Sequence, residues 1–333
     1  MRQENNALPR TAHSPRKTYR KRRSPILVIT VLLCIALPLL SIYFMANGRH
    51  DDVTNSSQIG SSSTAIQERE PQVPARQYQM SQPQQAYSQE NGPDDILVLT
   101  FGQLAEISND HLLLVNIDYA IPPYITGNLV RVSDYVRALS SETLINEYVL
   151  AMLRVMFDSA EAVGFTQFRV TQGFRTHEYQ QNLFDTAANQ SLVALPGHSE
   201  HQVGLAVDIS YEGVNIGNSA QGTWLMENSY RYGFILRYPA HKTEITRVPF
   251  EPWHYRYVGQ PHAYFMTKND LVLEEYIDLL RVIREIAITF NGTVYRIFYL
   301  SDHDDVIEIP KNHGFWASLD NTGGIIVTMW ANY

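Results

Sequence analysis

The sequence predicts an α+β fold, with a small mixed domain built on a central antiparallel sheet flanked by helices. One transmembrane helix and a disordered tether precede this domain, and a small β appendage follows it. Three observations lead to this prediction. Strand-like and helix-like runs alternate without a regular βαβ rhythm or a glycine-rich phosphate loop. An apolar run of membrane length lies near the N-terminus, and an Asn-Gly turn separates two apolar runs near the C-terminus.

Charge is distributed unevenly along the chain. The 333 residues carry a formal net charge of −8. Residues 1–25 hold eight basic residues against Glu4 alone, a net charge of +7, so the rest of the chain carries −15. We expect no nucleic-acid partner for such an acidic protein. The single cysteine, Cys34, lies in the apolar run, which excludes an intrachain disulfide and a cysteine nucleophile in a soluble domain.

The apolar run Ile26–Ala46 predicts a transmembrane signal anchor. It contains no charged residue, and as a helix it would span roughly 31 Å, enough to cross a hydrocarbon core. It is longer than the roughly 7 to 15 apolar residues of a signal peptide, and no clear cleavage site follows. A cleaved signal is the alternative. The basic residues predict a cytoplasmic tail at 1–25, which places everything after Asn47 outside the membrane.

Residues 47–93 are rich in serine, glutamine and proline, so we expect a flexible linker. A globular domain is predicted over 94–286, because apolar runs begin there. Within it, the spacing of apolar residues predicts a helix over Ser141–Gly164. Further elements are expected in this order: strand Phe168–Gln172, a helix from about Thr176, strands Val203–Ser210 and Trp253–Val258, and a helix over Leu271–Ile288.

Residues 287–333 are predicted to form the small β appendage. Asn291-Gly292 joins the runs EIAITF and TVYRIFYL, which indicates a hairpin. A turn at Asp320–Gly324 precedes an expected strand over Ile325–Trp330. No residue pattern in this region indicates chemistry.

Two segments, Pro196–Asp208 and Glu251–Arg256, carry the residue types of a metal site. A catalytic zinc takes three His, Asp or Glu ligands, keeps an open position, and has a further carboxylate nearby that accepts a proton. The ligand types are matched by His201, Asp208 and His254. The additional carboxylate is matched by Glu251.

The two ligands of the first segment can share one ion only if the chain bends. In a straight strand, residues 201 and 208 would lie about 23 Å apart and on opposite faces. Gly204 is the expected place of the bend. Pro252 similarly interrupts the second segment, so that its Glu and His side chains could reach the same cavity.

His198 is an alternative ligand, since it lies three residues before His201 and the two would pair on a helix. Pro196 and Gly197 before it, and the β-rich run after it, argue against a helix. Lone histidines such as His111, His262 and His313 are more simply explained as surface or capping residues than as ligands.

The two segments resemble the VanY-type D-alanyl-D-alanine carboxypeptidases of bacterial cell-wall metabolism. The similarity rests on S-x-H-x-x-G-x-A-x-D at Ser199–Asp208, E-P-W-H-Y-R-Y-V-G at Glu251–Gly259, Gly173-Phe174-Arg175 upstream, and YGFILRYP at Tyr232–Pro239. It runs from about Leu112 to Tyr276, about half of the chain. The resemblance implies that His201, Asp208 and His254 hold Zn²⁺ and that Glu251 is the general base.

The resemblance also implies the residues that contact the substrate. Arg175 would be catalytic and would bind the scissile carbonyl oxygen or the substrate carboxylate. Gln180, Ser199 and Trp253 match positions that line the substrate site in relatives. Two positions depart from the family pattern: Phe174 stands where many relatives carry tyrosine, and His198 stands where other small or polar residues are common.

The function that follows is a membrane-anchored, zinc-dependent carboxypeptidase of the bacterial cell membrane. We expect a single pass through residues 26–46, a cytoplasmic N-terminus and an extracellular catalytic domain. The enzyme would hydrolyse the terminal D-Ala from peptidoglycan stem peptides, using zinc-activated water. The oligomeric state is left open.

Several alternative functions are weighed against this one. An L,D-carboxypeptidase or a D,D-dipeptidase of the same fold would use the same metal site. A non-catalytic cell-wall-binding module is disfavoured because every expected ligand and the base are present. A serine D,D-peptidase is disfavoured because its only S-x-x-K candidate, Ser14–Lys17, lies in the cytoplasmic tail without an accompanying K-T-G.

Overall fold

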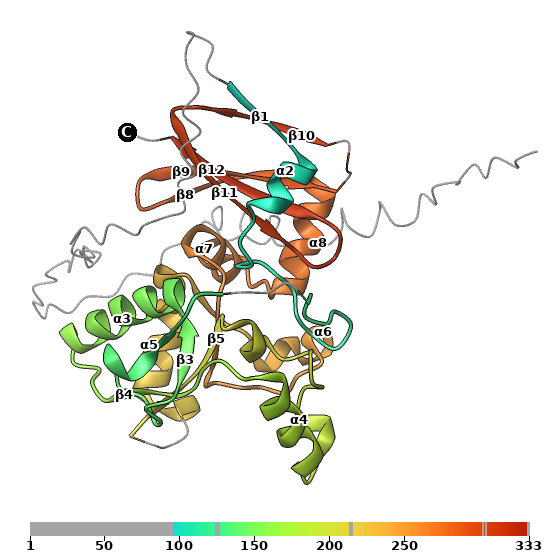
Figure 1. Cartoon of the computed structure of the whole chain (residues 1–333). Helices are drawn as coiled ribbons and strands as arrows, with labels where there is room; N and C mark the ends of the chain where they lie inside the picture. Colours follow the sequence, from blue (N-terminus) through green and yellow to red (C-terminus); the bar gives the residue numbers. More distant parts are fainter. Residues whose placement is uncertain (1–95, 124–126, 213–215, 302, 304, 332–333) are drawn as a thin grey trace, which may run out of the picture. The chain divides into compact units, whose positions relative to one another are not determined.

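The structure is a computed structural model that describes residues 96–123, 127–212, 216–301, 303 and 305–331 (Figure 1). They lie in one compact unit, Gln72–Tyr333. The predicted tail, anchor and linker at 1–25, 26–46 and 47–93 lie outside the described residues and stay predictions. In the part of the chain that is described, no helix has the length and apolar character needed to span a membrane.

A four-stranded antiparallel sheet forms the centre of the metal-binding part, as predicted. Its strand order is β4-β5-β7-β6. The bounds are β4 (Phe168–Gln172), β5 (Ala206–Tyr211), β6 (Phe234–Leu236) and β7 (His254–Tyr257). The predicted strands at 203–210 and 253–258 are therefore confirmed with shorter or shifted bounds. In the β5–β7 pair, Asp208 stands directly opposite His254, which places two of the predicted ligands on neighbouring strands.

The longest helix in the described part of the chain, α3 (Glu147–Ala162), packs its apolar face against this sheet. Asn146 caps its first turn by accepting from the backbone N–H of Tyr148, and the chain leaves the helix through Gly164 at φ +90°. The predicted start at Ser141 is wrong. Residues Leu144–Asn146 form a strand, β3, that pairs with β2 (Leu129–Arg131), because this pairing outweighs the helical spacing of the side chains.

Five further helices follow α3 in the described part of the chain. Their bounds are α4 (His177–Thr186), α5 (Ala220–Asn228), α6 (Thr243–Thr246), α7 (Gln260–Lys268) and α8 (Leu273–Ile283). Short 3-10 segments are η1 (Val132–Asp134), η2 (Gln190–Leu192), η3 (Glu200–Val203), η4 (Ile216–Asn218), η5 (Ser229–Tyr232) and η6 (Ala240–Lys242). The predicted helix at Leu271–Ile288 ends earlier than expected. Arg284 turns left-handed at φ +68°, and the following residues pair as a strand.

A second four-stranded antiparallel sheet follows, in the order β11-β12-β9-β8. Its strands are β8 (Glu285–Phe290), β9 (Thr293–Leu300), β11 (His313–Leu319) and β12 (Ile325–Ala331). The β8–β9 hairpin turns at Asn291 and Gly292, whose φ values are +48° and +79°. Two positive φ values are the signature of a type I′ turn, so the predicted hairpin is confirmed.

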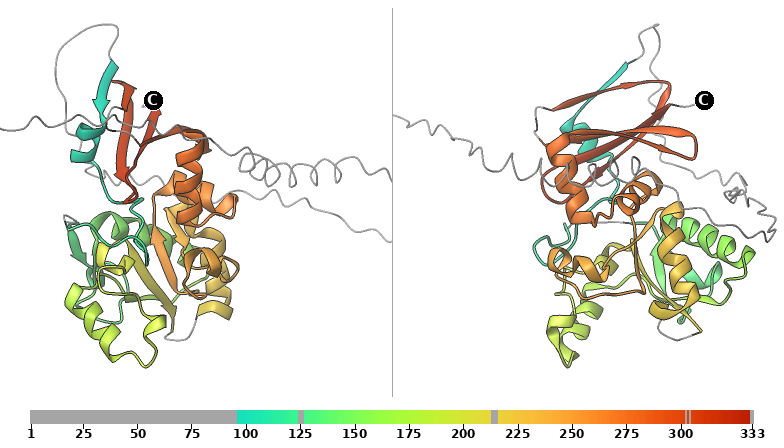
Figure 2. Two further views of the ribbon diagram at one scale, coloured as in Figure 1. Left: turned by 90° about the vertical axis from the view of Figure 1, so that its right-hand side faces the viewer. Right: turned by 180° about the vertical axis from the view of Figure 1, so that it is seen from behind.

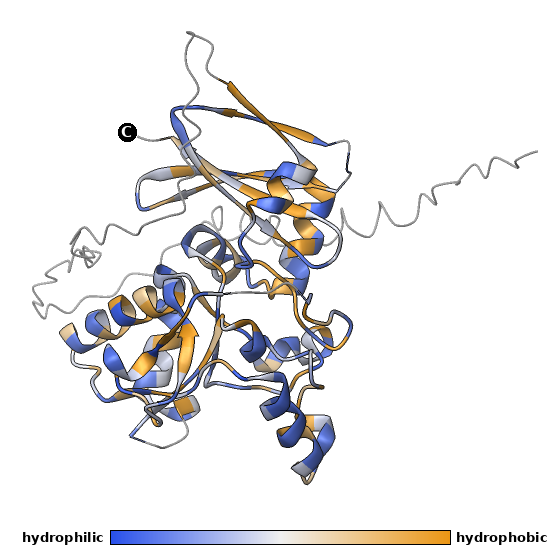
Figure 3. Ribbon diagram, viewed as in Figure 1, coloured by the Kyte–Doolittle hydropathy of each residue, from blue (hydrophilic) through white to orange (hydrophobic). Residues whose placement is uncertain are grey.

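The first described strand, β1 (Ile96–Thr100), does not join the central sheet. It pairs antiparallel with β10 (Val306–Pro310) near the C-terminus, and Figure 2 shows it beside the C-terminal strands. The strand is mostly hydrophobic in Figure 3. Together with α2 (Phe101–Glu106) it contributes Leu99, Phe101 and Leu104 to an apolar cluster with the C-terminal strands. Residues 96–106 thus pack with the predicted appendage, while the boundary at 286 stays a prediction.

Candidate metal centre

His201 is placed by a tight turn between two strands. It lies in η3, which ends at Gly204 in the left-handed region at φ +74°. A residue without a Cβ adopts this conformation readily, so the predicted bend is found where the glycine stands. The backbone oxygen of Gly173 lies 2.8 Å from the His201 Nδ1. Since a carbonyl oxygen can only accept a hydrogen bond, Nδ1 carries the proton and donates it to Gly173, and Nε2 is left with the lone pair that can bind a metal.

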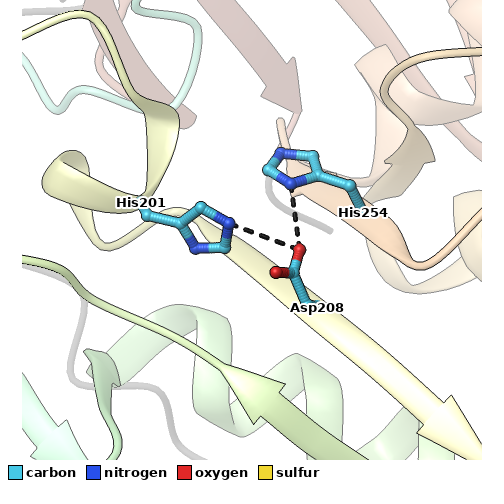
Figure 4. Close-up of side chains that lie close together, drawn as sticks. All are labelled: His201, Asp208 and His254. Atoms are coloured by element: carbon cyan, nitrogen blue, oxygen red, sulfur yellow. Dashed lines mark hydrogen bonds and ion pairs between the residues drawn. The ribbon is translucent and has the colours of Figure 1, made fainter. Parts of the chain in front are cut away.

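Asp208 and His254 come from the paired strands β5 and β7. Asp208 Oδ1 lies 3.0 Å from His254 Nδ1 and 3.3 Å from His201 Nε2, and Figure 4 shows both rings directed at this carboxylate. One ligand atom from each of the three residues lies within 4.8 Å of the other two, and all three residues are buried. The structure therefore brings together the three predicted ligands.

Glu251 lies beside this group. Its Oε2 is 3.8 Å from His254 Nδ1, and its backbone is held by a hydrogen bond from its N–H to the oxygen of Tyr238. The N–H of His254 in turn donates to the oxygen of Glu251 at 3.1 Å, so the chain turns sharply at Pro252. The carboxylate is thus close to the three donor residues without being one of them, and its role as a base stays a prediction.

Arg175 approaches the same group from the loop before α4. Its Nη2 lies 3.5 Å from Asp208 Oδ2, and its Nη1 donates to Gln180 Oε1 at 3.3 Å. The Nε of Arg175 is buried without a hydrogen-bond partner in the part of the chain described. A buried donor without a partner is costly, so this guanidinium is well suited to bind an anionic ligand.

The other predicted substrate residues lie close by. Gln180 is fully buried and donates through Nε2 to the oxygen of Ala194 at 2.8 Å, so it orients Arg175. Ser199 is buried immediately before η3. Trp253 packs partly buried against the main apolar cluster, and its backbone oxygen accepts from Ile209. The placement of Trp253 suits a core role as well as a substrate role.

His198, the alternative ligand, is not part of the group of three. Its Nδ1 lies 2.7 Å from the backbone oxygen of Asn116. The segment before η3 is a turn and not an α-helix, so the helical pairing of His198 with His201 does not form.

A buried carboxylate, Glu200, was missed by the sequence reasoning. It lies 3.3 Å from His254 Nε2 and pairs with the guanidinium groups of Arg237 and Arg256. Both arginines are fully buried. The signal that could have found the two arginines is a charged residue inside the apolar runs at 232–239 and 253–258, since buried charges in proteins are nearly always paired. Glu200 stands among polar residues and gives no such signal.

The electrostatics of the site favour a cation. Burial alone would raise the pKa of Asp208, but contact with His201 and His254 holds it well below its usual range. Burial lowers the pKa of His201. Although burial opposes it, hydrogen bonds to Asp208 and Glu200 raise the pKa of His254 to about 9. Burial raises the pKa of Glu251, as suits a proton acceptor.

The donor set fits Zn²⁺. Two imidazole nitrogens and one carboxylate oxygen are the ligand types of catalytic zinc sites, which leave a position open. With both rings neutral, the three donor residues carry a charge of −1 and attract a cation, and a bound divalent ion would keep a formal surplus of +1. Fold and site together define the class of a small α+β metallohydrolase.

Comparisons with known proteins identify the family. Residues 142–260 match the family model VanY, D-alanyl-D-alanine carboxypeptidase. A D-alanyl-D-alanine carboxypeptidase of Enterococcus faecium is 32% identical over 68% of this chain and 77% of its own length. The bifunctional D-Ala-D-Ala dipeptidase and D-Ala-D-Ala carboxypeptidase VanXYC of Enterococcus gallinarum is 40% identical over 36% of this chain and 71% of its own.

A solved structure is similar over most of the described chain. It is the vancomycin resistance D,D-dipeptidase VanXYg in complex with a D-Ala-D-Ala phosphinate analogue, with 27% identity and a TM-score of 0.61. The match covers 71% of this chain and 98% of that one. The chain belongs to the VanY family of D-alanyl-D-alanine carboxypeptidases, as its motifs predict, and Zn²⁺ is the cofactor that the family and the donor set support.

Proposed function

We propose that this protein is a membrane-anchored zinc carboxypeptidase that removes the terminal D-Ala from peptidoglycan stem peptides. The observation that carries the proposal is the buried group of His201, Asp208 and His254 with Glu251 beside it. Membership of a family of D-alanyl-D-alanine carboxypeptidases supports the substrate class. The charge-free run at 26–46 after a basic tail supports the anchor and an extracellular catalytic domain.

Glu251 is the proton carrier of the proposed reaction. Bound Zn²⁺ would act as a Lewis acid towards the water and the scissile carbonyl. Glu251 accepts the proton of the attacking water at a carboxylate oxygen and then donates it to the nitrogen of the departing D-alanine. Its raised pKa brings the carboxylate closer to the range in which it can both take up and release a proton.

Arg175 recognises the substrate in this proposal. Its Nε is buried and has no hydrogen-bond partner among the described residues, and it lies beside Asp208, so it is suited to bind a carboxylate or a developing oxyanion. Gln180 accepts a hydrogen bond from the Nη1 of this guanidinium at 3.3 Å and so helps to orient it. In a part of the protein that carries a net negative charge, such a local cation is needed to hold an anionic peptide terminus.

The test uses the purified full-length chain in detergent. Pentapeptide and tetrapeptide stems are incubated with it, with and without a chelator, and the products are identified by mass spectrometry. We expect loss of one D-Ala from the pentapeptide, abolished by chelator and restored by Zn²⁺. Free D-Ala-D-Ala is offered as a third substrate, and its hydrolysis to D-Ala without loss of D-Ala from the pentapeptide would favour the D,D-dipeptidase, as the similar VanXYg is named. Cleavage of the tetrapeptide alone would favour the L,D-carboxypeptidase.

A further inference from the structure

Glu200 lies next to the metal group without being a member of it. Its side chain is fully buried, and its Oε2 is 3.3 Å from the Nε2 of His254. The other nitrogen of that ring, Nδ1, faces Asp208 at 3.0 Å. The two nitrogens of His254 thus have different tasks, since Nδ1 is directed into the metal group and Nε2 towards Glu200.

The second oxygen of Glu200 is held by two arginines. Arg237 Nε and Arg256 Nη1 donate to Oε1 at 2.8 and 2.9 Å. With Oε1 occupied by two guanidinium groups, only Oε2 is left to accept from the imidazole. The carboxylate therefore has one orientation in which all its partners are satisfied.

The arginines are fixed by segments outside the family match at 142–260. Glu274, in the first turn of α8, accepts from Arg237 Nη1 at 2.9 Å and from Nη2 at 2.7 Å, a bidentate pair. On the other side, Arg256 Nη2 donates to the backbone oxygen of Leu113 at 2.9 Å. A continuous series of contacts thus runs from α8 to a metal ligand.

We propose that Glu200 is a positioning residue for His254, and that Glu274 on α8 acts on the metal site through Arg237. Glu200 accepts the Nε2 proton of the ring, which leaves the Nδ1 lone pair to the metal and fixes the ring's rotation. Such a carboxylate behind a histidine ligand raises its basicity and orients it. The inference rests on the proposed function, because it takes the three residues as zinc ligands.

Metal binding without substrate tests this directly. In the full-length chain, Glu200→Gln replaces the carboxylate by an amide with one oxygen, which cannot serve both the arginines and His254. We expect zinc affinity, measured by competition with a chromophoric chelator, to fall about 10-fold to 100-fold. The Co²⁺-substituted protein should also change its visible absorption bands, which report ligand geometry and would not respond to a merely structural role.

The proposed action of Glu274 on the metal site through Arg237 is tested by a matched pair of variants. Glu274→Gln removes the charge that holds Arg237. Glu275→Gln alters the next residue of the same helix. Its carboxylate pairs with Lys242 at 3.0 Å, and no hydrogen bond or ion pair joins it to Arg237 or Glu200 in the described structure. We expect weaker zinc binding and altered cobalt bands in Glu274→Gln alone. If Glu200→Gln does not fold, this pair of variants still tests whether α8 affects zinc binding, because Glu274→Gln leaves Arg237 paired with Glu200.

Two results would overturn the inference. One is a folded Glu200→Gln protein with native zinc affinity and native cobalt bands. The other is an equal effect of Glu274→Gln and Glu275→Gln on zinc affinity. Neither depends on peptide cleavage. A chain that binds zinc and responds as expected but cleaves no stem peptide would refute the proposed function alone, whereas active enzyme with unresponsive variants would refute the inference alone.

Discussion

Glu251 stands 3.8 Å from His254 and outside the group of three donors, so its role in catalysis can be separated from metal binding. We expect Glu251→Gln to lower the turnover of D-Ala release by roughly 10²-fold to 10⁴-fold, because an amide cannot accept the proton. Zinc content, measured by elemental analysis of the purified protein, should stay at the wild-type level. Wild-type turnover in this variant would exclude Glu251 as the base.

The histidines 201 and 198 differ in what their rings contact. His201 Nε2 faces Asp208, while His198 Nδ1 lies against the oxygen of Asn116. We expect His201→Ala to lose stoichiometric zinc, since two ligands remain, and His198→Ala to bind one zinc per chain. Titration with zinc followed by elemental analysis checks both. The opposite pattern would show that His198 is the ligand.

At the residue scale, the sequence was informative where chemistry is carried by rare residue types close together. Histidines and acids in two short segments predicted the group that the structure brings together. Glu200, Arg237 and Arg256 could not be found this way, because their roles depend on contacts between distant segments. Glu200 lies within one quoted motif, yet only the fold shows that it is buried between two guanidinium groups.

At the element scale, the bend before β5 decides where His201 points. Gly204 has φ +74°, and an added Cβ would lie 2.9 Å from Leu129 Cδ2. We expect Gly204→Ala to cost about 1 to 2 kcal/mol for the left-handed backbone and also to weaken zinc binding, since the turn holds η3. Urea unfolding and chelator competition measure the two effects.

Gly164 provides the control for this variant. It has φ +90° at the end of α3, and an added Cβ would have no atom within 4 Å. Gly164→Ala should therefore show a similar backbone cost but unchanged zinc affinity. Equal loss of zinc binding in the two variants would mean that the bend at Gly204 has no special link to the metal site.

The strand and helix errors have one physical cause. Leu144–Asn146 continues the helical spacing of α3 but pairs with β2, and residues after Ile283 continue the spacing of α8 but pair with β9. Apolar periodicity reports which side of a segment is buried, while pairing with a distant strand decides its conformation. The Asn-Gly hairpin was predictable because its signal lies entirely in adjacent residues.

At the scale of the whole molecule, His262 joins α7 to α8 and to the C-terminal sheet, and because it is fully buried, the expectation of a surface or capping role for it is wrong. His262 Nδ1 lies 2.6 Å from the hydroxyl of Tyr276 and Nε2 lies 2.9 Å from Thr328 Oγ1. Burial, with a smaller effect of nearby His111, lowers its pKa to about 3. In the unfolded chain the pKa of this histidine is near 6.5. Between pH 6.5 and pH 3, His262 is therefore protonated in the unfolded chain but not in the folded one.

Stability should consequently fall as the pH drops from about 6.5 towards 3. At pH 5 the protonation of His262 in the unfolded chain lowers the free energy of unfolding by roughly 2 kcal/mol relative to its value well above pH 6.5. We expect His262→Gln to lose some stability at pH 7 and to show a shallower decline between pH 7 and pH 5. Urea unfolding at both pH values checks this, and parallel declines in the two proteins would contradict it.

The pairing of β1 with β10 joins residues that are far apart in the chain, as Ile96 stands opposite Pro310. A ribosome adds roughly 5 to 20 residues per second, so β1 emerges about 10 to 40 s before its partner. During that time the residues of the central sheet are all made, while Leu99, Phe101 and Leu104 still lack their C-terminal neighbours. The metal-binding part is thus synthesised first, and the newly made chain depends on its last strands to cover the apolar residues at its beginning.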